Sequence, residues 1–252
     1  MKSKEKMITI VLPAYNEEES IGLLLSRFSD VMNKKKLVMR IIVVDDGSKD
    51  DTAAEAKRAM PDALIIVHKS NRGLGEAVKT GLIAALEASE EEDVIVTMDS
   101  DDSHAPALIA KMVDKIDEGC DVVIASRYLP ESRVIGVSFY RQILSNGASF
   151  LFRLLYPIDG VRDYTCGYRV YRASVLKQAF EKWGDDFVNQ SGFSVMIDIL
   201  LKLSQLNVVF GEVPIVLRYD RKPGVSKMNV GKTVIQTLQL LAKYRFGLVK
   251  KR

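Results

Sequence analysis

Short runs of β-branched and other apolar residues alternate with helical patterns through the first half of this 252-residue chain. The runs lie at residues 8–12, 37–44, 64–67, 94–98 and 122–125, and each is short and rich in Val and Ile, which predicts a buried strand. Apolar residues at helical spacing fill the intervals, so strand and helix follow each other four times. This order predicts an α/β fold with a mostly parallel sheet flanked by helices.

The expected helices carry start signals. Asn16 stands where an N-cap is expected for the first helix, with Glu19 three residues later. Asp50 or Asp51 is the expected cap of a helix over 52–60. Two further helices are expected over 76–88 and 106–118.

The second half has a different pattern. We expect an amphipathic segment over 134–155, a loop over 159–166, a strand at 168–171, helices at 174–182 and 192–206, a strand at 208–217, a polar loop at 218–228 and a last helix over 229–246. No Gly/Ser linker or internal repeat separates the halves. We therefore expect one domain over residues 1–252, with a C-terminal extension after residue 128.

Composition excludes several other classes of protein. The net charge of +3, from 36 Lys and Arg against 33 Asp and Glu, is too mild to make nucleic acid the expected partner. Two cysteines are too few for a disulfide framework or a four-thiolate zinc site, which favours a reducing compartment. No apolar stretch approaches the roughly 18–20 residues of a transmembrane helix, and the first apolar run ends at Pro13. We therefore expect an unprocessed cytoplasmic protein.

Candidate ligand-binding residues follow the expected strands, because ligands of parallel sheets bind beyond the carboxyl ends of the strands. They are Pro13, Tyr15 and Glu17 after the first run, Asp45 and Asp46 after the second, a glycine loop at 70–75 after the third, an acidic loop at 99–104 after the fourth and Arg127 after the fifth. Carboxylates, glycines and one arginine are therefore expected at one edge of the sheet.

Asp99 and Asp101 flank Ser100 at an expected strand end. Two carboxylates at one point repel each other unless a cation joins them, and oxygen ligands suit Mg²⁺ or Mn²⁺, which can bridge a diphosphate. The alternative is a solvated acidic loop in which Asp102 or Ser103 caps the next helix.

The loops after the second and third expected strands are less specific. Asp45-Asp46-Gly47-Ser48 is typical of a turn before a capped helix, for which one aspartate suffices, so the second is available to accept from a base N–H or a ribose hydroxyl. Tyr15 would pack beside that base. The glycine loop lacks the third glycine of a dinucleotide fingerprint and follows the third strand instead of the first, which disfavours an oxidoreductase.

Cationic residues recur in the second half, where a loop with Arg221 and Lys227 would suit a diphosphate, although an ordinary basic surface loop is the alternative. The set comprises Arg127, Arg141, Arg169, Arg218, Arg221, Lys222 and Lys227.

Few residues are candidates for a catalytic base. His68 and His104 have no partner at metal-ligand or triad spacing, so packing or capping is their expected role. Cys120 and Cys166 are expected to be small core residues. Asp198 lies in an apolar helix, where a carboxylate must be paired or face the cleft, and it is the one candidate base.

Together these motifs resemble those of family 2 glycosyltransferases of the GT-A fold. The motifs in the family's order and spacing are Val11-Leu-Pro-Ala-Tyr-Asn-Glu17, Val43-Val-Asp-Asp-Gly-Ser48, Asn71-Arg-Gly-Leu-Gly75 and Asp99-Ser-Asp101. The second half is most similar to dolichol-phosphate mannosyltransferases and related polyprenyl-phosphate hexosyltransferases, through Ser103-His104, Ala125-Ser-Arg127, residues 163–171 and residues 221–227. Ser100, Asp102, Ser103 and Tyr164-Thr-Cys166 depart from the family's usual residues.

The resemblance implies a role for each matching residue. Pro13, Tyr15, Glu17, Val44 and Asp46 would bind the nucleoside, Asp99, Ser100 and Asp101 the diphosphate, and Asp99 and Asp101 a Mg²⁺ or Mn²⁺ ion. Arg127, Arg221 and Lys227 would contact phosphates of the donor, and Arg141 with Arg127 the acceptor phosphate. Residues 1–128 would form the nucleotide-sugar-binding half and residues 129–252 the acceptor-side half.

The implied reaction is an inverting, metal-dependent transfer of mannose or glucose from GDP-mannose or UDP-glucose to a polyprenyl or dolichyl phosphate. Such an acceptor is ionised at pH 7 and needs no base, whereas the hydroxyl of a soluble glycan or polysaccharide precursor would need Asp198. A non-catalytic nucleotide-sugar-binding protein is the third alternative.

Two apolar segments with basic flanks, at 134–155 and in the last helix, suit an anionic membrane surface. Packing of both segments on the core is the alternative. Two locations are therefore open: the cytoplasm, and a peripheral position on the cytoplasmic face of the membrane. A membrane protein that supplies an anchor is a further expected partner.

Overall fold

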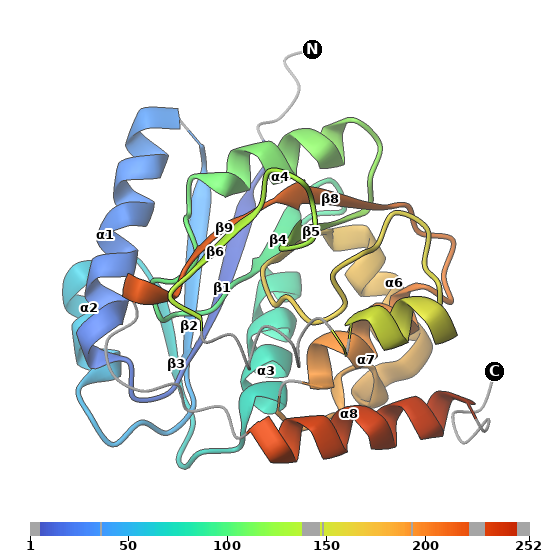
Figure 1. Cartoon of the computed structure of the whole chain (residues 1–252). Helices are drawn as coiled ribbons and strands as arrows, with labels where there is room; N and C mark the ends of the chain where they lie inside the picture. Colours follow the sequence, from blue (N-terminus) through green and yellow to red (C-terminus); the bar gives the residue numbers. More distant parts are fainter. Residues whose placement is uncertain are drawn as a thin grey trace.

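A seven-stranded sheet with strand order β3-β2-β1-β4-β7-β5-β8 organises the fold. The computed structural model describes residues 6–35, 37–137, 147, 149–192, 194–221 and 230–245. Helices cover both faces of the sheet, as Figure 1 shows. The expected α/β class with a mostly parallel sheet is therefore confirmed.

The first half contains the four strand–helix repeats that the sequence predicts. The elements are β1 (Ile8–Ala14), α1 (Glu18–Lys35), β2 (Met39–Asp45), α2 (Thr52–Ala59), β3 (Leu64–Val67), α3 (Leu74–Glu87), β4 (Val94–Thr97), α4 (Leu108–Asp117) and β5 (Val122–Ser126). β1 pairs in parallel with β2 and with β4, and β2 with β3. The register from Ile8↔Met39 to Ala14↔Asp45 ends β1 and β2 at the same edge.

The second half adds strands to the same sheet. Its elements are β6 (Arg133–Ile135), a helix over 149–155, β7 (Arg169–Arg172), α6 (Ala173–Trp183), η1 (Gly184–Val188), α7 (Ser194–Leu203), β8 (Phe210–Pro214), β9 (Val216–Arg218), η2 (Tyr219–Arg221) and α8 (Val230–Arg245). β7 lies antiparallel between β4 and β5, and β8 is parallel to β5.

The single strand expected over 208–217 is wrong, because the chain changes sheets at Ile215. Its N–H donates to Ser126 O of β5 (3.2 Å), whereas its carbonyl accepts from Arg133 N (2.9 Å). The preceding Pro214 has no N–H for a sheet ladder. Consequently β8 ends on the main sheet, and β9 pairs with β6 in a separate parallel ribbon.

Two expected helix caps are also wrong. Asn16 has a positive φ of 52° and precedes α1 by two residues; its Oδ1 accepts from Lys49 N (2.8 Å), which joins the first two loops. Ala107, and neither Asp102 nor Ser103, occupies the N-cap position of α4. For α2, Asp51 occupies the N-cap position as expected but makes no side-chain capping bond. The neighbouring Asp50 instead accepts from Thr52 N through its Oδ1 (3.1 Å).

Two hydrophobic clusters form the core. One contains residues of α1, α2 and α4, and the other contains residues of α3 and α6; residues of the central strands and of α7 belong to both. Cys166 lies in the first cluster, 5% exposed, as expected of a small core residue. Among the described residues, no helix combines the length and the hydropathy that crossing a bilayer requires.

Candidate functional site

The loops after β1, β2 and β4 are joined by hydrogen bonds at one edge of the sheet. Asp46 N donates to Ala14 O (2.8 Å), and Ser100 Oγ donates to Pro13 O (2.9 Å). Ser20 Oγ, at the start of α1, lies 3.2 Å from Ser100 O. The structure therefore brings together the nucleoside and diphosphate candidates that the sequence placed after different strands.

Asp46 is buried and connects the second loop to the third. Its Oδ1 lies 2.7 Å from His68 Nδ1 and accepts from Arg72 N (2.9 Å), and its Oδ2 accepts from Gly73 N (2.7 Å). Gly47 has a positive φ of 70°, and a Cβ there would lie 2.4 Å from the backbone of Ser70, so only glycine fits where the two loops touch.

The other nucleoside candidates lie at the same edge. Tyr15 and Glu17 are half-buried; Glu17 N donates to Thr52 Oγ1 (2.8 Å), and Glu17 Oε2 accepts from Ser20 Oγ (2.8 Å). The Val44 side chain is fully buried against α3, where a Cβ on Gly81 would lie 3.2 Å from it. A nucleoside would therefore meet the backbone of Val44 and not its side chain.

The acidic loop after β4 is ordered by its own side chains. Asp101 is 5% exposed, and its Oδ1 accepts from Ser103 N (3.1 Å) and Ser103 Oγ (2.5 Å). Asp99 is half-buried, and its Oδ1 would lie 3.4 Å from a Cβ on Gly167, just before β7. The solvated acidic loop considered as the alternative is therefore wrong for Asp101.

Asp102 is buried with a positive φ of 58°. Arg27 Nη2 of α1 lies 3.1 Å from its Oδ2, but neither oxygen has a well-aligned hydrogen-bond donor among the described residues. Burial raises the pKa of Asp102, and the charges of Arg27 and Arg221 oppose that rise. Arg221, although exposed on η2, is therefore close enough to the acidic loop to act on it electrostatically.

The donor set of this loop fits a hard divalent cation. In the described part of the chain, no group of three or more His, Cys, Asp or Glu side chains is arranged to hold a metal ion, so the described residues offer a carboxylate pair at most. Mg²⁺ usually takes one or two carboxylates and fills its remaining positions with substrate phosphates and water. Asp99 and Asp101 would hold such an ion, and its charge would stabilise a departing diphosphate.

Arg127 is held by a buried carboxylate. Its Nε and Nη2 donate to Asp163 Oδ2 (2.8 Å) and Oδ1 (2.7 Å), and its backbone N also donates to Oδ2 (3.0 Å). Burial disfavours both charges, but the pair outweighs burial, so that the pKa of Asp163 is lowered and the pKa of Arg127 is raised. In the sequence, Asp163 is marked only by the family resemblance over residues 163–171, and no local signal indicates that it pairs with Arg127.

The other candidate cations differ in whether their side chains are positioned to bind a phosphate. Arg169 is fully buried and donates to three backbone carbonyls, those of Cys166, Met196 and Tyr164, so its expected role at a phosphate is wrong. Arg218 forms a bidentate pair with Asp220 (2.8 Å for both bonds). Arg141, Lys222 and Lys227 lie outside the described residues.

Asp198 is paired, which was the first of its two expected arrangements. The carboxylate is 1% exposed, forms an ion pair with Lys202 one turn along α7, and accepts from Tyr244 Oη of α8 (2.8 Å). Burial and the nearby Asp198 charge raise the pKa of Tyr244, which therefore remains a donor. These two contacts explain why a carboxylate is found in this apolar helix.

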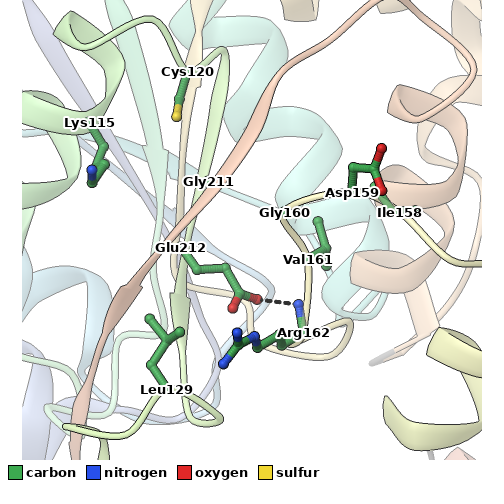
Figure 2. A pocket seen from close by; sticks show the side chains of 10 residues that line it. All are labelled: Lys115, Cys120, Leu129, Ile158, Asp159, Gly160, Val161, Arg162, Gly211 and Glu212. Carbon is green, nitrogen blue, oxygen red and sulfur yellow. Dashed lines mark hydrogen bonds between the residues drawn. The ribbon is translucent and has the colours of Figure 1, made fainter.

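A hollow of about 460 Å³ lies elsewhere, at the β5–β8 side of the sheet. Figure 2 shows Glu212 reaching the backbone N of Arg162 (2.6 Å) in this hollow. It is lined by Lys115, Cys120, Leu129, Ile158, Asp159, Gly160, Val161, Arg162, Gly211 and Glu212. None of the candidate site residues is among them, so the hollow is not the site described above.

Comparison with known proteins connects this geometry to a family. The profile of glycosyl transferase family 2 matches residues 9–180. Polyprenol monophosphomannose synthase of Mycolicibacterium smegmatis is 35% identical over 87% of this chain and 80% of its own length. Undecaprenyl-phosphate mannosyltransferase of Micrococcus luteus is 31% identical over 89% of this chain and 88% of its own. Dolichol-phosphate mannosyltransferase of Pyrococcus furiosus is 34% identical over 92% of this chain, which spans 62% of that protein.

Solved structures share the fold at lower identity. A mycobacterial protein superimposes with a TM-score of 0.70 at 22% identity, over 94% of this chain and 74% of its own. Glucosyl-3-phosphoglycerate synthase of Mycobacterium tuberculosis, in complex with Mn²⁺, UDP-glucose and phosphoglyceric acid, superimposes with a TM-score of 0.67 at 22% identity, over 94% and 79%. At this identity the likeness concerns the fold alone.

Proposed function

Because this chain belongs to glycosyl transferase family 2 and is a hexosyltransferase, we propose that it transfers a hexose, mannose or glucose, from a nucleoside diphosphate sugar to a polyprenyl phosphate. The relatives in three organisms are named for mannosyl transfer and for polyprenol, undecaprenyl-phosphate or dolichol-phosphate. Family membership disfavours the non-catalytic alternative. Mannose is the sugar that the relatives' names favour.

The observation that carries the proposal is the joining of the Asp46 loop and the Asp99–Asp101 loop at the end of β1. In our proposal the first loop binds the nucleoside, together with Pro13, Tyr15 and Glu17. The second loop faces the diphosphate, and Asp99 and Asp101 hold Mg²⁺ or Mn²⁺, as the chemistry of the donor set allows. The nucleoside and the diphosphate leaving group would then be bound by two loops that hydrogen bonds to β1 hold in a fixed position relative to each other.

The acceptor phosphate would be bound by Arg127, whose guanidinium Asp163 orients through a bidentate pair, together with Arg141. Arg221, which lies near the acidic loop, and Lys227 would contact the phosphates of the donor. An oxygen of a phosphate monoester is ionised at pH 7, so it can attack the anomeric carbon without a general base, with inversion at that carbon.

The pairing of Asp198 supports a phosphate acceptor over a hydroxyl. A base must be free to accept the proton of the attacking group. Asp198 already accepts from Lys202 and Tyr244 in a buried position. A hydroxyl acceptor would need another base, and a phosphate acceptor needs none.

We further propose a peripheral position on the cytoplasmic membrane face, because charge is strongly segregated along the chain. Residues 132–158 and 221–252 together contain 12 Lys and Arg and no Asp or Glu, a charge of +12. The rest of the chain has 24 cations against 33 acids, or −9, which accounts for the net +3. Each well-placed cation contributes about 1 kcal/mol at an anionic surface.

The described parts of these two segments touch each other and expose apolar side chains. Tyr156 Oη, just after the helix over 149–155, donates to Leu241 O of α8 (3.3 Å); that helix is the yellow one near α8 in Figure 1. Phe150 and Leu154 are 60% and 65% exposed beside Arg153, and Ile235 of α8 is 58% exposed. Such side chains with basic flanks suit the lipid interface where a polyprenyl phosphate resides. A membrane-protein partner would add an anchor.

The test is donor turnover with and without the lipid. GDP-mannose and UDP-glucose are incubated with Mg²⁺ or Mn²⁺ and a short polyprenyl phosphate, and both nucleoside diphosphate and lipid-linked sugar are measured. The matched control is the same polyprenol without its phosphate. We expect release of one diphosphate that depends on the lipid phosphate. Donor hydrolysis that neither lipid changes would overturn the proposed acceptor.

A further inference from the structure

We propose that His68 is a positioning residue that orients Asp46 for the nucleoside of the donor; this inference rests on the proposed function. His68 directly follows β3 and is 8% exposed. Its Nδ1 lies 2.7 Å from Asp46 Oδ1, and its Nε2 lies 3.0 Å from Thr80 Oγ1 of α3. The imidazole therefore joins Asp46 to the helix behind the loop.

The direction of the His68–Asp46 hydrogen bond follows from the other donors. Arg72 N and Gly73 N both donate to the Asp46 carboxylate, which is how an ionised carboxylate is bound. An ionised carboxylate only accepts, so Nδ1 must carry the hydrogen. The Thr80 hydroxyl can donate or accept, and it meets Nε2 in either state of the ring.

The number of donors at each oxygen determines which oxygen of Asp46 can accept a further hydrogen bond. Oδ1 already accepts from His68 and from Arg72 N, which fills the two positions of a carboxylate oxygen. Oδ2 accepts from Gly73 N. Of the two oxygens, Oδ2 can therefore accept one more hydrogen bond, from an N–H of the base or a hydroxyl of the ribose. The two bonds at Oδ1 prevent the carboxylate from rotating.

The turn itself does not require the His68–Asp46 pair. Ser48 N donates to Asp45 Oδ1 (2.9 Å), so Asp45 stabilises the turn after β2. Asp46 is left to hold the third loop and to present Oδ2. A substitution that removes only the His68 donor should therefore act on nucleoside binding more than on the fold.

Two substitutions at the same position separate the two nitrogens. In His68→Asn the side-chain amide nitrogen takes the place of Nδ1 and still donates to Asp46, whereas in His68→Gln it takes the place of Nε2 and leaves Asp46 without this donor. Thr80→Val is the matched control, because it removes the contact at Nε2 alone. Binding of GDP and UDP is measured by calorimetry, donor KM and kcat by turnover, and folding by the melting temperature.

We expect His68→Gln to weaken nucleoside diphosphate binding and to raise the donor KM about tenfold. The kcat should stay within about twofold of the wild type, because the lost interaction stabilises the bound substrate and the transition state equally. His68→Asn and Thr80→Val should remain within about threefold of the wild type. Equal affinity in His68→Gln and the wild type, or equal losses in both His68 variants, would overturn the positioning role while the proposed function stands. A wild-type protein that binds neither GDP nor UDP would overturn both. If His68→Gln does not fold, a loss of affinity in a folded His68→Asn gives the same refutation.

Discussion

The buried pair of Arg127 and Asp163 gives the sharpest prediction on stability. Asp163 is fully buried, and its two oxygens accept two side-chain bonds from Arg127 and backbone N–H groups that include those of Arg127 and Cys166. Asp163→Asn keeps the shape of the side chain but replaces one carboxylate oxygen by an NH₂ group. This new donor would face the N–H donors that the oxygen accepts from in the wild type. It also leaves the Arg127 guanidinium, 20% exposed, without its counter-charge.

Removing one partner of such a pair costs about 3–5 kcal/mol, because the remaining charge stays buried and uncompensated. For a chain of this length, each kcal/mol lowers Tm by about 2–4 °C, so the expected fall is on the order of 10 °C. Urea unfolding can be followed by the fluorescence of Trp183, the only tryptophan of the sequence, which stacks on Phe187.

The chain offers a matched control for this substitution. Asp220 forms an equally bidentate pair with Arg218, but the two side chains are 37% and 36% exposed. Asp220→Asn should therefore leave the unfolding midpoint within the error of measurement. If Asp163→Asn costs no more than Asp220→Asn, burial is not what makes the Arg127–Asp163 pair important. Arg127→Met in the Asp163→Asn background should recover part of the loss, because it removes the unpaired charge.

Three further results are expected. The pKa of Asp163 is lowered in the folded protein, so the ionised carboxylate stabilises the fold at pH values above its ordinary pKa of 3.8, and this stabilisation is lost as the pH falls below 3.8. The free energies of unfolding of the wild type and Asp163→Asn, measured by urea titration, should therefore converge in acid. Asp102→Asn should raise the free energy of unfolding at neutral pH by about 1 kcal/mol, because burial raises the pKa of Asp102 and asparagine tolerates a positive φ; an unchanged or lower Tm would contradict this. Asp101→Asn should lower kcat at least about 100-fold if the carboxylate holds the metal, as several kcal/mol of transition-state stabilisation would be lost, and normal turnover of the folded variant across a Mn²⁺ titration would exclude that role.

What the sequence could predict was local or followed from topology. The β-branched runs locate β1 to β5 within two residues at each end. Burial on both faces explains this for β1, β2, β4 and β5. The expected burial is wrong for β3, an edge strand of the sheet whose Leu64 and Val67 are exposed. The position of the Asp46 loop and the acidic loop at the end of β1 follows from parallel strands that end at one edge. Both inferences need only the order of elements along the chain.

What was missed depends on contacts between distant residues. Asp163 lies 36 residues from Arg127, and no periodicity marks their pairing. Asn16 adopts a positive φ and accepts a hydrogen bond from Lys49 in another loop, a contact that no capping rule includes. For Asp198 a local signal was available, since Lys202 follows at i+4, although Tyr244 of α8 was not foreseeable.

The position of β7 limits how this enzyme can be divided. Its backbone separates β4 from β5, so the sheet of residues 1–128 is completed by a strand from after residue 160. A fragment that ends at residue 128 would expose two unpaired strand edges in its middle, and such edges recruit other chains. Chimaeras between this protein and its relatives should therefore exchange β7 and β8 together with residues 1–128, and unfolding of the two halves of the chain should coincide in a single calorimetric transition.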